Sequence, residues 1–167
     1  MDNIEFRKAE EQDLNAVFLV FTDAIDEMIR HNILQWDELY PDRNILYNDI
    51  QSRQLYIGMI EDKIASVFVL NQECDEEYTD GNWEYPNATY YVIHRLCVNP
   101  HFQNRGIGLT TMKHIHKEMK QIGIETIRLD SYTLNPYAVK MYTKLGYNKV
   151  GYVNWRKGRF YLMEKKL

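Results

Sequence analysis

Hydrophobic and polar positions follow two different periods along the chain, and these periods predict its helices and strands. Between Glu11 and Arg30 apolar residues recur at helical spacing, and similar patterns return over residues 43–53, 106–123 and 135–145. Alternating or continuous apolar runs typical of strands cover residues 4–9, 54–60, 64–72, 88–98, 125–132, 147–153 and 159–167. The predicted order is β-α-α-β-β-β-α-β-α-β-β. It indicates an α/β (α+β) fold, with a mixed sheet and helices on both of its faces.

Length and composition predict one soluble globular domain over residues 1–167. The chain has 167 residues, of which 45% are hydrophobic and 26% charged, enough apolar surface for a single sizeable core. The formal net charge is −4. Because phosphate binding needs a clustered basic surface, this charge argues against a nucleic acid as the main partner.

Membrane and secretory features are not expected either. No run approaches the roughly 18 apolar residues of a membrane span, and the first residues lack the basic and apolar regions of a signal peptide. Cys74 sits in an acidic segment and Cys97 in an apolar strand pattern, so we expect no disulfide between them. Cys/His spacings typical of zinc sites are missing, and we expect no metal. Together these features predict a cytoplasmic protein.

A glycine-containing turn in the middle of the chain is the clearest candidate for ligand binding. In "VNPHFQNRGIGLTTM", residues 98–112, an apolar strand runs into a polar turn and then directly into an amphipathic helix. The first N–H groups of a helix have no intrahelical partner and carry partial positive charge, so they favour a phosphate or pyrophosphate. Glycine lets a backbone approach such a ligand closely. Arg105 adds a cation, and Gln103 and Asn104 add polar side chains.

Two common phosphate loops do not fit this turn. A Walker loop needs Lys-Ser/Thr after its second glycine, where this chain has Leu109-Thr110. A dinucleotide fingerprint needs a third glycine, and Thr111 occupies that position. From the turn alone, a glycine-rich helix start that serves only packing remains an equally good interpretation.

The turn also resembles a family signature. Gln103-Asn104-Arg105-Gly106-Ile107-Gly108 is similar to the Q/R-x-x-G-x-G/A loop of the GCN5-related N-acetyltransferases, and "LDSYTLNPYAVKMYTKLGYNKVG" resembles a later stretch of the same family. The order of elements is similar over nearly the whole chain. The resemblance implies a mostly antiparallel mixed sheet of about seven strands flanked by about four helices. It also implies acetyl-CoA as the acyl donor.

Positions for the cofactor follow from the resemblance, residue by residue. The loop would hold the pyrophosphate through N–H groups of residues 104–109. The strand before it would pair its backbone with the pantetheine arm, and Asn135 would contact that arm. The implied cofactor-binding residues are Leu96, Cys97, Val98, Gln103, Asn104, Arg105, Gly106, Ile107, Gly108, Leu109, Asn135 and Tyr142.

Two residues are candidates for the chemistry. Tyr142 matches the family tyrosine near the cofactor sulfur, where a phenol can protonate a departing thiolate; the alternative is a helix tyrosine that packs on the sheet. His94 lies two residues before Leu96 and has a side chain whose unperturbed pKa suits removal of a proton from an amine. The family often has a glutamate in or near this strand, and a core histidine is the alternative. An N–H near Leu96 would stabilise the oxyanion.

Acceptor binding is expected around "HNILQWDELYP" and the acidic segment 73–84. Trp36, Glu38 and Tyr40 would form an aromatic and anionic pocket for a cationic amine, with Glu84 as a further candidate; a core position for Trp36 and a merely solvated acidic loop are the alternatives. We predict direct transfer in a ternary complex to a small-molecule amine, and a homodimer is possible. The alternatives are a protein N-terminal or lysine acetyltransferase and a non-catalytic acyl-CoA-binding or sensing module.

Overall fold

The computed structural model describes residues 3–167. The first two residues, which belong to the N-terminal stretch predicted not to be a signal peptide, lie outside this range. Over this range the α-helices are α1 Leu14–Arg30, α2 Arg43–Gln51, α3 Ile107–Gln121 and α4 Pro136–Lys144. The strands are β1 Glu5–Lys8, β2 Leu55–Ile60, β3 Lys63–Asn71, β4 Tyr90–Val98, β5 Thr126–Tyr132, β6 Asn148–Trp155 and β7 Gly158–Lys166. The strand order β1-β2-β3-β4-β5-β7-β6 confirms the expected mixed, mostly antiparallel sheet.

The described chain groups into two compact units. Unit 1 comprises the chain up to Leu70 together with Arg95–Met112, and unit 2 comprises Asn71–His94 together with Lys113–Leu167. The chain passes from one unit to the other within β3, β4 and α3, so these elements contribute residues to both.

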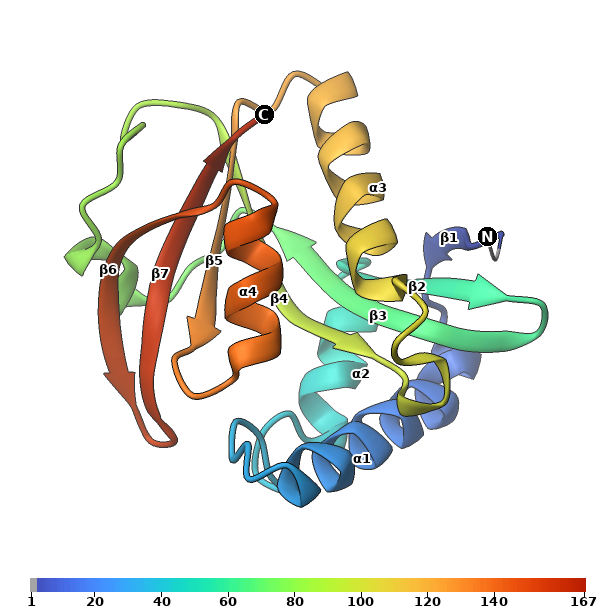
Figure 1. Cartoon of the computed structure of the whole chain (residues 1–167). Helices are drawn as coiled ribbons and strands as arrows, with labels where there is room; N and C mark the ends of the chain where they lie inside the picture. Colours follow the sequence, from blue (N-terminus) through green and yellow to red (C-terminus); the bar gives the residue numbers. More distant parts are fainter. Residues whose placement is uncertain (1–2) are drawn as a thin grey trace. The chain divides into compact units, whose positions relative to one another are not determined.

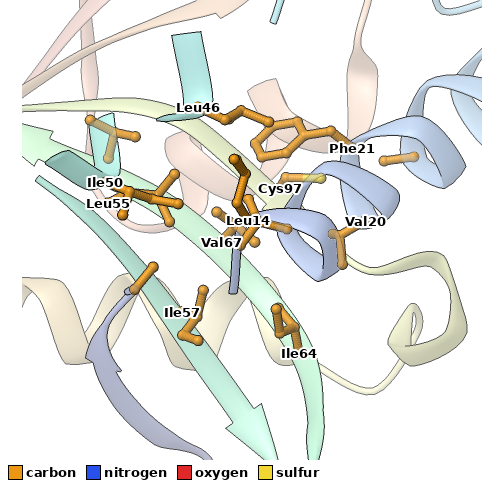
Figure 2. Close-up of a cluster of buried hydrophobic side chains, with 14 of the residues drawn as sticks. Leu14, Val20, Phe21, Leu46, Ile50, Leu55, Ile57, Ile64, Val67 and Cys97 are labelled. Atoms are coloured by element: carbon orange, nitrogen blue, oxygen red, sulfur yellow. The ribbon is translucent and has the colours of Figure 1, made fainter. Parts of the chain in front are cut away.

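Unit 1 is built on the antiparallel strands β1, β2 and β3, with α1 and α2 packed against one face (Figure 1). Figure 2 shows the resulting core: α1 contributes Leu14, Val20 and Phe21, α2 contributes Leu46 and Ile50, and the hairpin contributes Leu55, Ile57, Ile64 and Val67. On the other face, the hydroxyl groups of Ser66 and Thr111 lie 2.9 Å apart, which packs the first turns of α3 onto β3. Helices therefore cover both faces of this part of the sheet, as expected.

Unit 2 contains the parallel pair β4–β5 and the antiparallel strands β5, β7 and β6, with α4 beside β5 (Figure 1). Strand β6 lies at the edge of the sheet. There Asn82 N–H donates to the Val150 carbonyl at 2.7 Å, so a loop covers part of the exposed strand edge. No helix within residues 3–167 is both long and apolar enough to cross a membrane.

Candidate functional site

The glycine turn of unit 1 is held from behind by Asn99. Its side-chain amide donates to the Ile64 carbonyl at 2.7 Å, its N–H donates to the Ala65 carbonyl at 2.9 Å, and its side-chain oxygen accepts the His101 N–H. Phe102 is buried with Ala65 and Ile107. These contacts fix the point at which β4 ends and the turn begins. Sequence reasoning missed the role of Asn99, although the Asn-Pro pair is a local signal for a strand end.

Beyond Phe102 the turn adopts backbone conformations that leave space in front of the helix. Asn104 and Gly106 have φ of +61° and +74°, and a Cβ built on Gly106 would meet nothing within 4 Å. The first helical bond that closes here runs from Thr110 N–H to the Gly106 carbonyl at 3.0 Å, so the N–H groups before Thr110 lie at the start of the ladder. The turn thus offers open space beside a backbone without a Cβ, at the start of a helix of 15 residues. These features fit a pyrophosphate.

The side chains of the turn divide into an outward and an inward group. Gln103, Asn104 and Arg105 are exposed, and the Arg105 guanidinium lies 5.1 Å from the centre of the Phe102 ring. Ile107 is buried, so a contact with a ligand would come from its N–H and not from its side chain. The predicted cofactor role of the loop residues is compatible with these positions and remains a prediction.

The second half of β4 is the stretch expected to pair with the pantetheine arm. Its parallel pairing with β5 runs from Tyr90–Thr126 to Ile93–Leu129, and the strand itself continues to Val98. Arg95, with a φ of +51°, interrupts its regular geometry. The Cys97 side chain points into the core of unit 1, where burial raises the pKa of the thiol (Figure 2). Cys97 can therefore offer only backbone groups to a ligand.

Arg95 is held by side chains from α2 and from the segment before it. Its guanidinium makes two hydrogen bonds with the Asp49 carboxylate, at 2.9 and 2.7 Å, and a third with the Tyr40 hydroxyl at 2.8 Å. Only 13% of the Arg95 side chain and 12% of the Asp49 side chain are exposed. This network, which joins residues up to 55 positions apart, had no signal in the sequence.

The predicted acceptor residues lie in different surroundings. Trp36 is buried in the core of unit 1, with its ring centre 5.4 Å from that of Phe21, which agrees with the core alternative. Tyr40 is 38% exposed and Glu38 is exposed. Glu84, on unit 2, is also exposed, and its carboxylate accepts a hydrogen bond from the Asn148 side chain at 3.3 Å. Their part in acceptor binding remains a prediction.

His94, the candidate base, is partly buried, and its Nε2 makes hydrogen bonds. Its Nε2 lies 2.9 Å from the side-chain oxygen of Asn71 and 2.9 Å from the backbone carbonyl of Glu73. The Asn71 oxygen also accepts the Glu73 N–H at 2.9 Å. The end of β3 therefore orients the imidazole, a contact between residues 23 positions apart that no local pattern indicates.

Tyr142, the candidate acid, is buried on α4, with 7% of its surface exposed. Burial, and to a lesser degree the charge of Asp130, raises the pKa of its phenol, so the hydroxyl stays protonated at neutral pH. Its ring lies edge-on to that of Tyr147 at 5.7 Å. Asn135 caps the same helix through its side-chain oxygen, which accepts the Ala138 N–H at 3.2 Å.

The acidic segment 73–84 is anchored more firmly than a solvated loop. Tyr78 is buried and donates its hydroxyl proton to the Asp130 carboxylate at 2.7 Å, and the Trp83 indole donates to the Tyr78 carbonyl at 2.8 Å. The Arg128 guanidinium lies 4.4 Å from the centre of the Trp83 ring and 4.1 Å from that of Tyr90. The aromatic residues fix the backbone of the loop, while most of its carboxylates face solvent.

Comparison with known proteins assigns the family. The model of the acetyltransferase (GNAT) family matches residues 22–147, which is most of the chain. The chain belongs to this family. The expected resemblance is thereby confirmed, and members of the GNAT family use acetyl-CoA as their acyl donor. A search of curated proteins gives no significant match.

Solved structures with the same GNAT fold cover almost the whole chain. A GNAT family acetyltransferase from Streptococcus agalactiae 2603 is 22% identical with a TM-score of 0.86, over 98% of this chain and 95% of that one. A putative acetyltransferase from Staphylococcus aureus Mu50 is 25% identical with a TM-score of 0.76, over 96% and 97%. PaiA N-acetyltransferase from Thermoplasma acidophilum, in complex with coenzyme A, is 20% identical with a TM-score of 0.72, over 99% of each chain.

Proposed function

We propose that this GNAT acetyltransferase transfers the acetyl group of acetyl-CoA directly to the amine of a small molecule, in a ternary complex in the cytoplasm. The observation that carries the proposal is the turn at Gly106. Its open backbone at the start of α3 coincides with the sequence that resembles the family's pyrophosphate-binding loop. Acetyl-CoA supplies a thioester, whose carbonyl carbon is open to attack by an amine and whose thiolate can leave.

Binding of this donor would use backbone groups more than side chains. N–H groups of residues 104–109 would donate to the pyrophosphate oxygens, and exposed Arg105 would add a charge-assisted hydrogen bond. Backbone groups of residues 96–98 would pair with the amides of the pantetheine arm. Because these donors belong to a helix start and a strand end, they are preorganised before the donor arrives.

Three groups would act on the reacting atoms. His94 would take the proton from the incoming amine, since an ammonium group has no lone pair with which to attack. The N–H near Leu96 would stabilise the charge that develops on the carbonyl oxygen. Tyr142 would donate its hydroxyl proton toward the departing sulfur, since a phenol whose pKa is not below its usual value carries its proton at neutral pH.

The acceptor is proposed to be a cationic small amine. Glu38 and Tyr40 are both exposed and lie two residues apart in the chain, and the Asp49 carboxylate is already neutralised by Arg95. Glu38 therefore remains as an anionic group of this segment that can attract an ammonium group. Trp36 would support this segment from the core, and Glu84 would add negative charge from the acidic loop.

An acceptor panel with acetyl-CoA, read as release of free thiol, tests the proposal. The panel holds monoamines, diamines, amino acids, peptides with free N-termini and lysine-containing peptides. We expect at least one small amine to be acetylated faster than every peptide. Faster reaction of a peptide would replace the small-molecule acceptor by a protein. If calorimetry shows acetyl-CoA binding while no acceptor releases thiol, the chain is a binding module.

A further inference from the structure

The hydrogen bonds around His94 determine which of its ring nitrogens carries a proton. Its Nε2 has two neighbours at 2.9 Å, the side-chain oxygen of Asn71 and the backbone carbonyl oxygen of Glu73. A carbonyl oxygen can only accept a hydrogen bond. Nε2 must therefore be the donor in both contacts, and it must carry a hydrogen.

The orientation of the Asn71 amide is fixed independently of the histidine. An asparagine oxygen and nitrogen can be exchanged when only one ambiguous partner is present. Here the Glu73 backbone N–H donates to the same Asn71 atom at 2.9 Å, and an N–H requires an acceptor. The Asn71 atom that faces His94 is therefore its oxygen, and Asn71 is itself only 8% exposed.

We infer that Asn71 is a positioning residue, which together with the Glu73 carbonyl holds His94 in the tautomer with Nε2 protonated and leaves Nδ1 as the nitrogen that gains and loses a proton. The inference rests on the proposed role of His94 as the base. In each turnover the amine's N–H bond would break, the proton would move to Nδ1, and the imidazolium would later release it to solvent. Nε2 keeps its hydrogen throughout.

Nuclear magnetic resonance of the ¹⁵N-labelled protein tests the tautomer without any turnover. Long-range ¹H–¹⁵N correlations distinguish a protonated from an unprotonated imidazole nitrogen, and His94→Gln identifies the His94 signals among the five histidines. We expect a protonated Nε2 and an unprotonated Nδ1 in neutral His94, and a smaller excess of this tautomer in Asn71→Ala, in which the Glu73 carbonyl is the remaining acceptor. A neutral wild-type His94 with its hydrogen on Nδ1 would overturn the inference.

The pH dependence of kcat/KM provides a second readout, which a purely structural role of Asn71 would not change. Asn71→Asp places a negative charge next to Nε2–H, stabilises the imidazolium and should move the acidic limb up by about one pH unit. Asn71→Ala removes an acceptor of the Nε2 hydrogen, so the imidazolium is less stable and the acidic limb should move to lower pH. Loss of activity in both variants without opposite shifts would reduce Asn71 to a structural residue. Gln72→Ala, whose side chain donates to the Tyr90 carbonyl, is the control and should shift nothing.

The other ionisable groups near Asn71 and His94 are the same in the wild type and in both Asn71 variants. A difference in pH dependence between these proteins therefore reports the residue at position 71. On the flanking elements of unit 2 these groups are the side chains of Glu73, Cys74, Asp75, Tyr78 and Asp130, the last two hydrogen-bonded to each other. Arg95 follows on the same strand, with Asp49 as its partner.

Failure of the inference can be told apart from failure of the proposed function. If the wild type acetylates no amine, the proposed function fails, and an NMR titration of His94 in the two Asn71 variants still measures the opposite shifts. If turnover is present but the tautomer is the other one, only the inference fails.

Discussion

Tyr142 and Tyr147 show how two buried tyrosines five residues apart in sequence differ in their surroundings. Tyr142 is buried with its pKa raised, and its ring contacts Tyr147 edge-on. The Tyr147 hydroxyl lies 2.8 Å from Nε2 of His116 and is thus occupied within the fold. We therefore propose a chemical role for the Tyr142 hydroxyl and a structural role for the Tyr147 hydroxyl.

Tyr142→Phe should lower kcat by about 10²-fold or more, the usual contribution of a general acid, while acetyl-CoA still binds. Tyr147→Phe is the matched control. It should cost about 1 kcal/mol of unfolding free energy, because His116 loses a hydrogen-bond partner, and should leave kcat unchanged. Steady-state kinetics and urea unfolding of both variants measure these effects. Equal kcat values for Tyr142→Phe and the wild type would remove the acid from the mechanism.

His116 gives the stability of the fold a defined pH dependence. Burial, and then the positive charge of Lys165, lowers its pKa to about 4 from 6.5. Between these two values the unfolded chain binds more protons at this site than the folded chain does. The free energy of unfolding therefore falls as the pH falls through this window.

His116→Gln should weaken that dependence, because glutamine can accept the Tyr147 hydroxyl and does not titrate. Urea unfolding at several pH values between 7 and 4.5 should show a shallower loss of stability than in the wild type. His114, whose pKa is also lowered by burial, is present in both proteins, so the difference reports His116 alone. Parallel curves would show that His116 is not the group that titrates.

At the scale of elements, α3 begins in a backbone conformation that suits glycine. Gly106 and Gly123, before and after the helix, have φ of +74° and +83°, and a Cβ on either would meet nothing within 4 Å. The two positions impose the same backbone strain on any other residue. They differ in function, because only Gly106 lies in the turn proposed to hold the pyrophosphate.

Gly106→Ala and Gly123→Ala should each lower the unfolding free energy by about 1–2 kcal/mol, the cost of a left-handed conformation with a Cβ. Only Gly106→Ala should also weaken acetyl-CoA binding, since its methyl group occupies the space in front of the helix. Isothermal titration calorimetry on both variants separates the two effects. Equal affinities would show that the turn serves packing alone.

The interruption of β4 at Arg95 is held in place by α2. The Arg95 side chain is mostly buried and makes a bidentate contact with Asp49, so removal of the carboxylate leaves an uncompensated charge. Trp36 and Phe21 pack against each other in the same unit.

Asp49→Ala should destabilise the fold by about 3 kcal/mol, as expected when one partner of a buried ion pair is lost. Glu27→Ala is the control: Glu27 pairs with Arg30 and His31 on the surface of α1, and its removal should have a far smaller effect. Urea unfolding measures the loss of stability in both variants, and we expect their m-values to equal that of the wild type. If both variants lose a similar, small amount of unfolding free energy, water solvates the Arg95 guanidinium and the prediction is contradicted.

For the whole molecule, a ligand that binds only the folded state raises its stability by mass action. Acetyl-CoA at 100 times its Kd contributes about 2.7 kcal/mol, which for a chain of this size corresponds to a rise in Tm of about 5–10 °C. A short acetyl thioester without the nucleotide is the control and should leave Tm unchanged, because the proposed site is centred on the pyrophosphate. No shift with saturating acetyl-CoA would contradict donor binding.

Much of the fold could be predicted because its signals are local. Each helix and strand was found within a few residues of its expected bounds, since apolar spacing, Asn-Pro helix starts and glycine stops act over a single turn. The acidic loop was the exception. Its aromatic anchors, Tyr78 and Trp83, contact Asp130 and Arg128 of a strand far along the sequence, so the acidic sequence alone did not indicate an anchored backbone.

The sequence by itself determined the family, the acyl donor and the turn proposed to bind it, because loop signatures and helix starts depend on neighbouring residues. Tertiary structure alone decided that Trp36 is buried, that Arg95 pairs with Asp49 and that Asn71 orients His94. Arg95 and Asp49 lie 46 positions apart in the sequence, and Asn71 and His94 lie 23 positions apart. Such contacts arise when packed elements bring polar groups together that must then satisfy one another, and no local pattern records them.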